Sequence, residues 1–211
     1  MGRMAILPEY SSADAEMIES LASALFSREV VLEKTDALLE ECRERAERFY
    51  ASNQTNVAGK TLAMCTQHAA MGVVTERAVA ELLGAEARPD FDLTKPSTYS
   101  ADVVTPSGLR VEVKSFSRAY LRYCRLTYPD YALRTLRSHR NEVDAVVFAS
   151  AVSETDDSWT VGAAWVLETE KFLDSLASPI GDDYVRFSPY GVKRLLAGDV
   201  FAVNPKYVDM E

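Results

Sequence analysis

Asp102 and Glu112 are the two residues whose types and spacing most clearly suggest chemistry. The segment 101–116 has the pattern of two short strands around a three-residue connection that ends in Gly108, which suits a type I turn with glycine in the left-handed position. If the strands pair symmetrically about this turn, Asp102 lies across from Glu112 with the Cβ atoms about 4.5–5.5 Å apart. The sequence therefore predicts two carboxylates forced together on one strand pair.

Like charges in directly opposed positions destabilise a sheet, so a positive charge is expected nearby. Lys114 lies two residues beyond Glu112, on the same strand face, and supplies part of it. A divalent cation would supply the rest. The alternative is a half-exposed strand with solvated charges, which explains Arg110 but not the opposed carboxylates.

Glu76 is a further candidate, on the helix expected before the hairpin. Val73, Glu76, Ala80 and Leu83 share one helix face, so the carboxylate interrupts an apolar stripe. A metal or a lysine would relieve the cost of burying it. Alternatively, Glu76 lies near a helix start and only favours the helix dipole. Residue types alone leave both interpretations open.

The elements that must position these residues follow from hydrophobic spacing and from glycine and proline. We expect helices over 11–26, 31–50, 57–83 and 168–176, a loop over 85–100, and strands over 144–150, 159–167 and 200–203. The third helix should bend near Gly72 and end at Gly84. This order predicts an α/β fold with a central mixed sheet flanked by helices. We expect an N-terminal helical region over 1–70 and a catalytic core over 71–211.

Charge is unevenly distributed along the 211 residues. The net charge is −9, yet the segment 110–140 carries eight basic side chains against two acidic ones, a local charge of +6. Arginine is suited to bidentate phosphate contact, so this segment is a candidate DNA-binding surface. The alternative is a solvated surface paired with the acidic remainder. The candidate DNA contacts are Arg118, Arg122, Arg125, Arg134, Arg137, Arg140, Ser115 and Ser117.

Asp102 and the run Glu112-Val113-Lys114, with Glu76 on the preceding helix, resemble the PD-(D/E)XK nuclease superfamily, which has the restriction-endonuclease-like fold. The resemblance covers roughly residues 72–172, and its motif is short and degenerate. One departure is Ala101, which stands where the motif has proline.

Pro89-Asp90 and Asp92 are rivals for the aspartate position, because Pro89-Asp90 is a literal match to the start of the motif. They rank below Asp102, since their distance from Glu112 does not place them on the strand that pairs with it.

The resemblance implies a metal-dependent endodeoxyribonuclease, a hydrolase of phosphodiester bonds. Asp102, Glu112, the Val113 carbonyl and Glu76 would form the oxygen site that Mg²⁺ prefers, with Mn²⁺ as a substitute. Lys114 would hold or deprotonate the attacking water, or bind the scissile phosphate, and these roles stay open.

Within that superfamily, we predict a restriction-type enzyme acting on double-stranded DNA. We expect a homodimer with the N-terminal helices at its interface. The alternatives are a repair, recombination or phage nuclease, such as a junction resolvase or an exonuclease, and an inactive nucleic-acid-binding module on the same fold. No segment has the length of a membrane span, so we expect a cytoplasmic protein.

Overall fold

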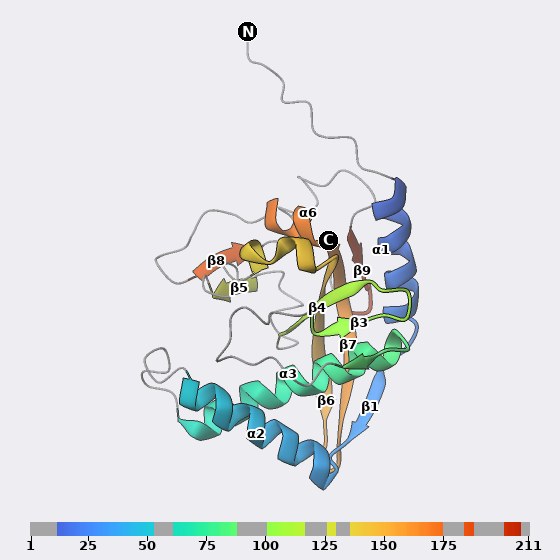
Figure 1. Ribbon diagram of the computed structural model, residues 1–211. Helices are drawn as coiled ribbons and strands as arrows, with labels where there is room; N and C mark the ends of the chain where they lie inside the picture. The colour runs from blue at the N-terminus through green and yellow to red at the C-terminus, as the bar shows by residue number, and fades with distance from the viewer. Residues whose placement is uncertain are drawn as a thin grey trace.

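Helices and strands are mixed along the chain in the computed structural model (Figure 1). It describes residues 12–52, 61–87, 101–116, 126–129, 136–174, 184–187 and 201–207. The α-helices are α1 (Ser12–Leu25), α2 (Asp36–Ser52), α3 (Leu62–Leu82) and α6 (Thr169–Asp174), and a short 3₁₀ helix, η2, covers Arg140–Glu142. The strands are β1 (Val30–Glu33), β2 (Glu86–Ala87), β3 (Val103–Val104), β4 (Arg110–Ser115), β5 (Leu126–Pro129), β6 (Ala145–Glu154), β7 (Ser158–Glu168), β8 (Tyr184–Phe187) and β9 (Phe201–Val203).

A seven-stranded mixed sheet organises the fold. Its strand order is β1-β7-β6-β4-β3-β2, and β9 also pairs with β7. The β4–β6 pair is parallel, whereas the other pairs in this sheet are antiparallel. β1 and β9 pair with different halves of β7, and a separate two-stranded sheet joins β5 to β8. The predicted α/β class with a central mixed sheet and flanking helices is confirmed.

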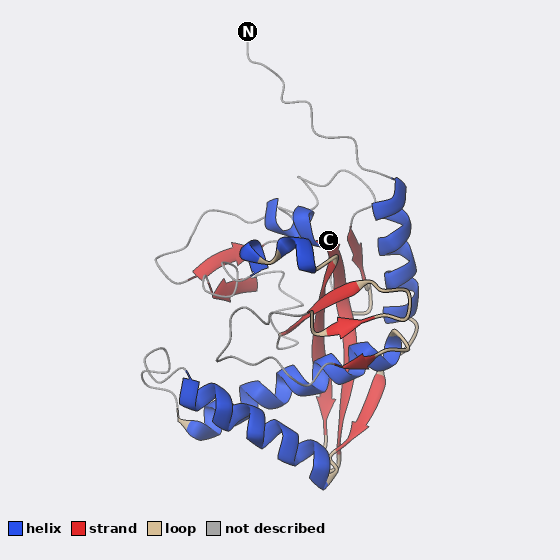
Figure 2. Cartoon of the chain, in the orientation of Figure 1, coloured by secondary structure: helices blue, strands red, loops and turns tan. Residues whose placement is uncertain are grey.

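The two faces of the sheet have different coverings. α1 and α3 contribute to one apolar core with Val111 and Val113 of β4 and Val147 of β6. On the other face, the ring of Phe148 in β6 packs against Phe172 of α6, with ring centroids 5.5 Å apart. Because both faces are covered, β6 and β7 are long apolar strands, as expected for interior strands. Figure 2 shows the helices arranged around the strands.

Local signals define both ends of α3. The Thr61 hydroxyl accepts a hydrogen bond from the Met64 N–H at the start of the helix. At the other end, Gly84 has a φ of +61°, and the Ala85 N–H donates to the Ala80 carbonyl. This is the glycine-terminated end that the sequence predicts. The expected bend at Gly72 does not interrupt the helix, which is continuous through that residue.

The predicted helix over 31–50 is wrong in its first turn. Residues Val30–Glu33 form β1, which pairs with Val161 and its neighbours in β7, and the helix begins at Asp36. A short apolar run of this kind is compatible with a helix or a strand, and here the pairing with the distant strand β7 makes it a strand.

Residues from both sides of the proposed domain boundary at 70 lie in the same helix and in the same sheet. α3 runs across that position, and β1 lies in the same sheet as β4. No helix in the described ranges is long and apolar enough to cross a membrane.

Candidate active site

The predicted hairpin and its register are confirmed. Val103 pairs with Val111 and Val104 with Arg110, the symmetric register about the turn. Gly108 has a φ of +90°, so it adopts the left-handed conformation that the turn requires. Continuing this register by one residue places Asp102 across from Glu112.

Asp102 directly precedes β3 and hydrogen-bonds to the edge of β4. Its Oδ2 atom accepts a hydrogen bond from the Val113 N–H at 2.7 Å. In an extended strand, the N–H and C=O of one residue point to the same side, so the Val113 carbonyl also faces the side on which Asp102 lies. The carboxylate and this carbonyl thus meet at one sheet edge.

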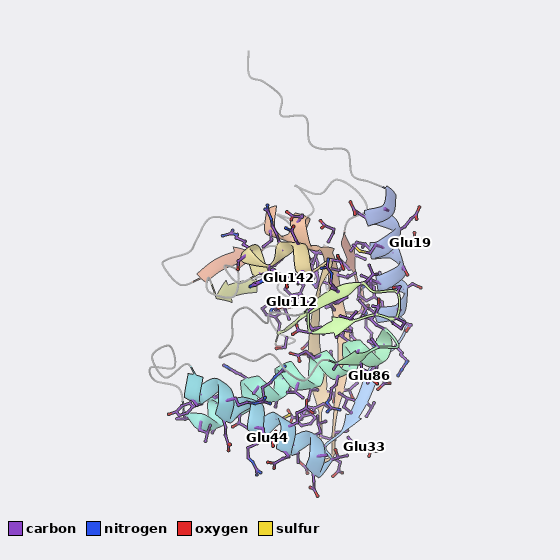
Figure 3. The ribbon with its side chains drawn as sticks, in the orientation of Figure 1. Glu19, Glu33, Glu44, Glu86, Glu112 and Glu142 are labelled. Carbon is purple, nitrogen blue, oxygen red and sulfur yellow. The ribbon has the colours of Figure 1, made fainter. Side chains whose placement is uncertain are left out.

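Glu112 is buried despite its charge. Its side chain is 7% exposed, and its Oε1 atom accepts a hydrogen bond from the Lys114 ammonium within an ion pair. The parallel register aligns Glu112 with Val146 and Lys114 with Phe148, so both lie on the sheet face opposite the α3 core. In Figure 3, Glu112 lies in the middle of the molecule, whereas Glu19, Glu33 and Glu44 lie on its periphery. This placement contradicts the alternative of solvated charges at this position.

Glu76 is paired with a residue that the sequence analysis did not identify. Its Oε2 atom accepts a hydrogen bond from Nη1 of Arg45 at 2.7 Å, and the two side chains are 12% and 22% exposed. Arg45 comes from α2, which packs alongside α3. The available signal was its helical spacing, because Arg45 lies three residues after the buried Cys42 and seven after the buried Leu38.

Arg45, Glu76, Asp102, Glu112 and Lys114 form one electrostatically connected group, here called the charged cluster. Burial raises the pKa of Asp102 well above its ordinary value, and the negative charges of Glu112 and Glu76 raise it further. Burial also raises the pKa of Glu76, while the guanidinium of Arg45 opposes that shift. The cluster therefore concentrates negative charge that a bound cation would stabilise.

The donor set fits a hard divalent cation. Asp102 and Glu112 offer carboxylate oxygens, and Val113 offers a carbonyl oxygen at the same edge. Within the described ranges, no three side chains of histidine, cysteine, aspartate or glutamate lie close enough together to hold one ion. Glu76 therefore does not join the two hairpin carboxylates as a third close side chain.

Few of the predicted DNA contacts can be placed. Ser115 ends β4 and is partly buried, while Arg137 and Arg140 are exposed near η2. Nε of Arg140 lies 3.6 Å from Oε1 of Glu170. The remaining predicted contacts, Ser117, Arg118, Arg122, Arg125 and Arg134, lie outside the described residues. The same holds for the rival carboxylates Asp90 and Asp92.

Comparison with known proteins defines the class. A family model described as bacteriophage T4 endonuclease IV matches residues 17–178, which include the whole charged cluster. The matched class is an endonuclease, a hydrolase with DNA as its substrate. Since the match spans more than half of the sequence, the chain belongs to the bacteriophage T4 endonuclease IV family. Searches of curated proteins and of solved structures returned no match.

This family corrects the predicted type of nuclease. The match supports the phage-nuclease alternative and not the restriction-type prediction. Membership of an endonuclease family confirms the prediction of a nuclease and favours an enzyme over an inactive binding module.

Proposed function

We propose that this chain is a Mg²⁺-dependent DNA endonuclease of the PD-(D/E)XK type, with its active site at the charged cluster. The observation that supports this most strongly is the hairpin register, which opposes Asp102 to Glu112 and puts the Lys114 ammonium on Glu112. A site on interior strands and a short hairpin is held rigidly, as catalysis requires.

Asp102, Glu112 and the Val113 carbonyl are the proposed metal ligands. Bound there, Mg²⁺ or Mn²⁺ would lower the pKa of a coordinated water and offset charge on the phosphate. Glu112 is buried and oriented by Lys114, and Asp102 is fixed by the Val113 N–H. These contacts hold two of the three oxygen donors before substrate binds.

Lys114 is the proposed proton-handling or phosphate-binding residue. Its ammonium contacts Glu112, so it lies within reach of a water or phosphate oxygen placed beside that carboxylate. Hydrolysis forms a P–O bond to the water oxygen and breaks the P–O bond to a sugar oxygen. The water loses one proton, and the departing sugar oxygen gains one.

The experiment is cleavage of covalently closed circular DNA, which lacks the ends that an exonuclease requires. We expect nicked or linear products in Mg²⁺ or Mn²⁺, none with a chelator, and almost none with Lys114→Met. Lys206→Met is the matched control, because it removes another lysine paired with a glutamate, Glu29, away from the cluster. Full activity of Lys114→Met, or cleavage that persists with the chelator, would refute the proposal.

Substrate strandedness and oligomeric state remain predictions. The same assay with single-stranded circles of matching sequence tests the predicted preference for double-stranded DNA. Sedimentation equilibrium with and without DNA tests the predicted homodimer.

A further inference from the structure

The charged cluster contains a second cation, Arg45, that comes from a different part of the chain from the hairpin. Its guanidinium is mostly buried and donates to Glu76 at 2.7 Å. Burial disfavours its charge, but Glu76 and then Asp102 outweigh burial and raise the pKa of Arg45 above its ordinary value. Arg45 is therefore a permanent positive charge that contacts Glu76 and is coupled electrostatically to Asp102.

The pairing with Arg45 determines what Glu76 can do. A carboxylate on a helix next to a metal site is the kind of ligand that a second divalent ion would use. Here the Oε2 atom of Glu76 accepts from the Arg45 guanidinium. In addition, no three acidic, histidine or cysteine side chains of the described residues gather around one point. Glu76 thus binds a cation of the protein itself.

Gly72 lies beside this pair but is not required by it. Gly72 lies one turn before Glu76 on α3, and a Cβ there would lie 3.6 Å from Nη1 of Arg45 and 3.7 Å from Oε1 of Glu76. Both are ordinary van der Waals distances, so an alanine would also fit at this position and the guanidinium does not depend on the glycine. The hydrogen bond to Glu76 uses one of the five N–H donors of the guanidinium.

We propose that Arg45 is the second cationic centre of the nuclease site, so that each chain binds one divalent ion and Arg45 supplies the positive charge that a second ion would provide. This inference rests on the proposed function, because it concerns the same metal site. In a two-metal nuclease, two ions about 3.5–4 Å apart flank the scissile phosphate. A guanidinium can supply a fixed positive charge to the same site without occupying the position of an ion, since its planar donors match phosphate oxygens and its charge does not depend on metal concentration.

The first test is the number of ions bound by the wild-type protein. Mn²⁺ is titrated into the full chain, and free Mn²⁺ is measured by electron paramagnetic resonance. We expect one tightly bound ion per chain, lost in Asp102→Asn. Two ions of comparable affinity that both depend on Asp102 would overturn the inference while leaving the proposed function intact. Binding that is unaffected by Asp102→Asn would instead overturn the proposed function.

Variants of Arg45 supply the second test. Arg45→Met leaves Glu76 without its cation, so we expect a second, weaker Mn²⁺ site that disappears again in Arg45→Met/Glu76→Gln. We also expect a fall in kcat on the order of 100-fold, partly rescued in Arg45→Lys because the charge is retained. Arg77→Met is the matched control, since Arg77 joins α3 to Glu41 of α2 in a more exposed ion pair.

Circular dichroism spectra and unfolding curves confirm that each variant is folded before Mn²⁺ is added. An Arg45→Met protein that is folded, binds one ion and cleaves DNA at the wild-type rate would contradict the inference. So would an Arg45→Lys protein no more active than Arg45→Met, because the inferred role depends on the positive charge.

Discussion

Breaking the Arg45–Glu76 ion pair is expected to destabilise the folded protein through the carboxylate left behind. The Glu76 side chain is 12% exposed, so its charge would have little water to replace the guanidinium. Removing one partner of a buried pair costs about 3–5 kcal/mol, and the residual exposure here favours the lower end, about 3 kcal/mol. For a chain of this size, that corresponds to a fall in Tm of roughly 6–12 °C.

The assay is thermal and urea unfolding of Arg45→Met in the presence of a chelator. Arg77→Met is again the control, because its pair with Glu41 is 48% and 23% exposed and should contribute about 0–1 kcal/mol. The double variant Arg45→Met/Glu76→Gln should recover much of the loss, since it removes the uncompensated charge.

The loss should also depend on pH. Burial raises the pKa of Glu76, although Arg45 opposes the shift, so the folded protein binds an extra proton at pH values between the ordinary glutamate pKa and this raised pKa. Stability then falls as pH rises above the ordinary glutamate pKa. Without Arg45 to oppose it, this effect grows, and the deficit of Arg45→Met should be larger at about pH 8 than at about pH 5. A deficit equal to that of Arg77→Met at both pH values would refute the reasoning.

Three further predictions concern other contacts. Asp102→Asn should raise the free energy of unfolding, measured at neutral pH in the presence of a chelator. Burial and then the charge of Glu112 raise the pKa of Asp102, so its ionised form is unfavourable in the folded protein. That gain should disappear below about pH 4, where the Asp102 carboxyl is protonated in both the folded and the unfolded protein. An Asp102→Asn variant that is less stable than wild type at neutral pH would contradict the prediction. Mn²⁺ should raise the Tm of wild type but not of Asp102→Asn, as differential scanning fluorimetry would show. Gly162→Ala should cost about 1–3 kcal/mol, because its Cβ would overlap the ring and hydroxyl of the buried Tyr207 side chain. Gly72→Ala should change stability by less than about 1 kcal/mol, because its Cβ would make only ordinary van der Waals contacts. Equal effects of the two substitutions in urea unfolding would contradict this reasoning.

Local signals in the sequence predicted the hairpin correctly. A turn that needs a left-handed glycine fixes which residues face each other, and so the opposition of Asp102 and Glu112 follows from a few neighbouring residues. The buried strand at β6 was also predictable, because a continuous apolar run covered on both faces has a distinctive composition.

Features that depend on distant contacts could not be predicted. β1 forms because Val30 and its neighbours pair with β7, which lies more than a hundred residues later in the sequence. A buried carboxylate that needs a cation was one of the two interpretations of Glu76 that the sequence left open, and the structure provides Arg45 from another helix. Which arginine lies opposite a given glutamate depends on how α2 packs on α3, and helical spacing alone does not determine that packing.

Replacing the Glu112 carboxylate is the most direct test of a metal-dependent nuclease site on this hairpin. The measurement is the single-turnover rate of DNA cleavage in saturating Mg²⁺ by Glu112→Gln, with Glu44→Gln on the exposed side of α2 as the control. If Glu112 acts at the reacting centre, the rate should fall by at least about 100-fold, while the control stays at the wild-type rate. A folded Glu112→Gln protein that cleaves DNA as fast as Glu44→Gln would contradict the assignment of this site.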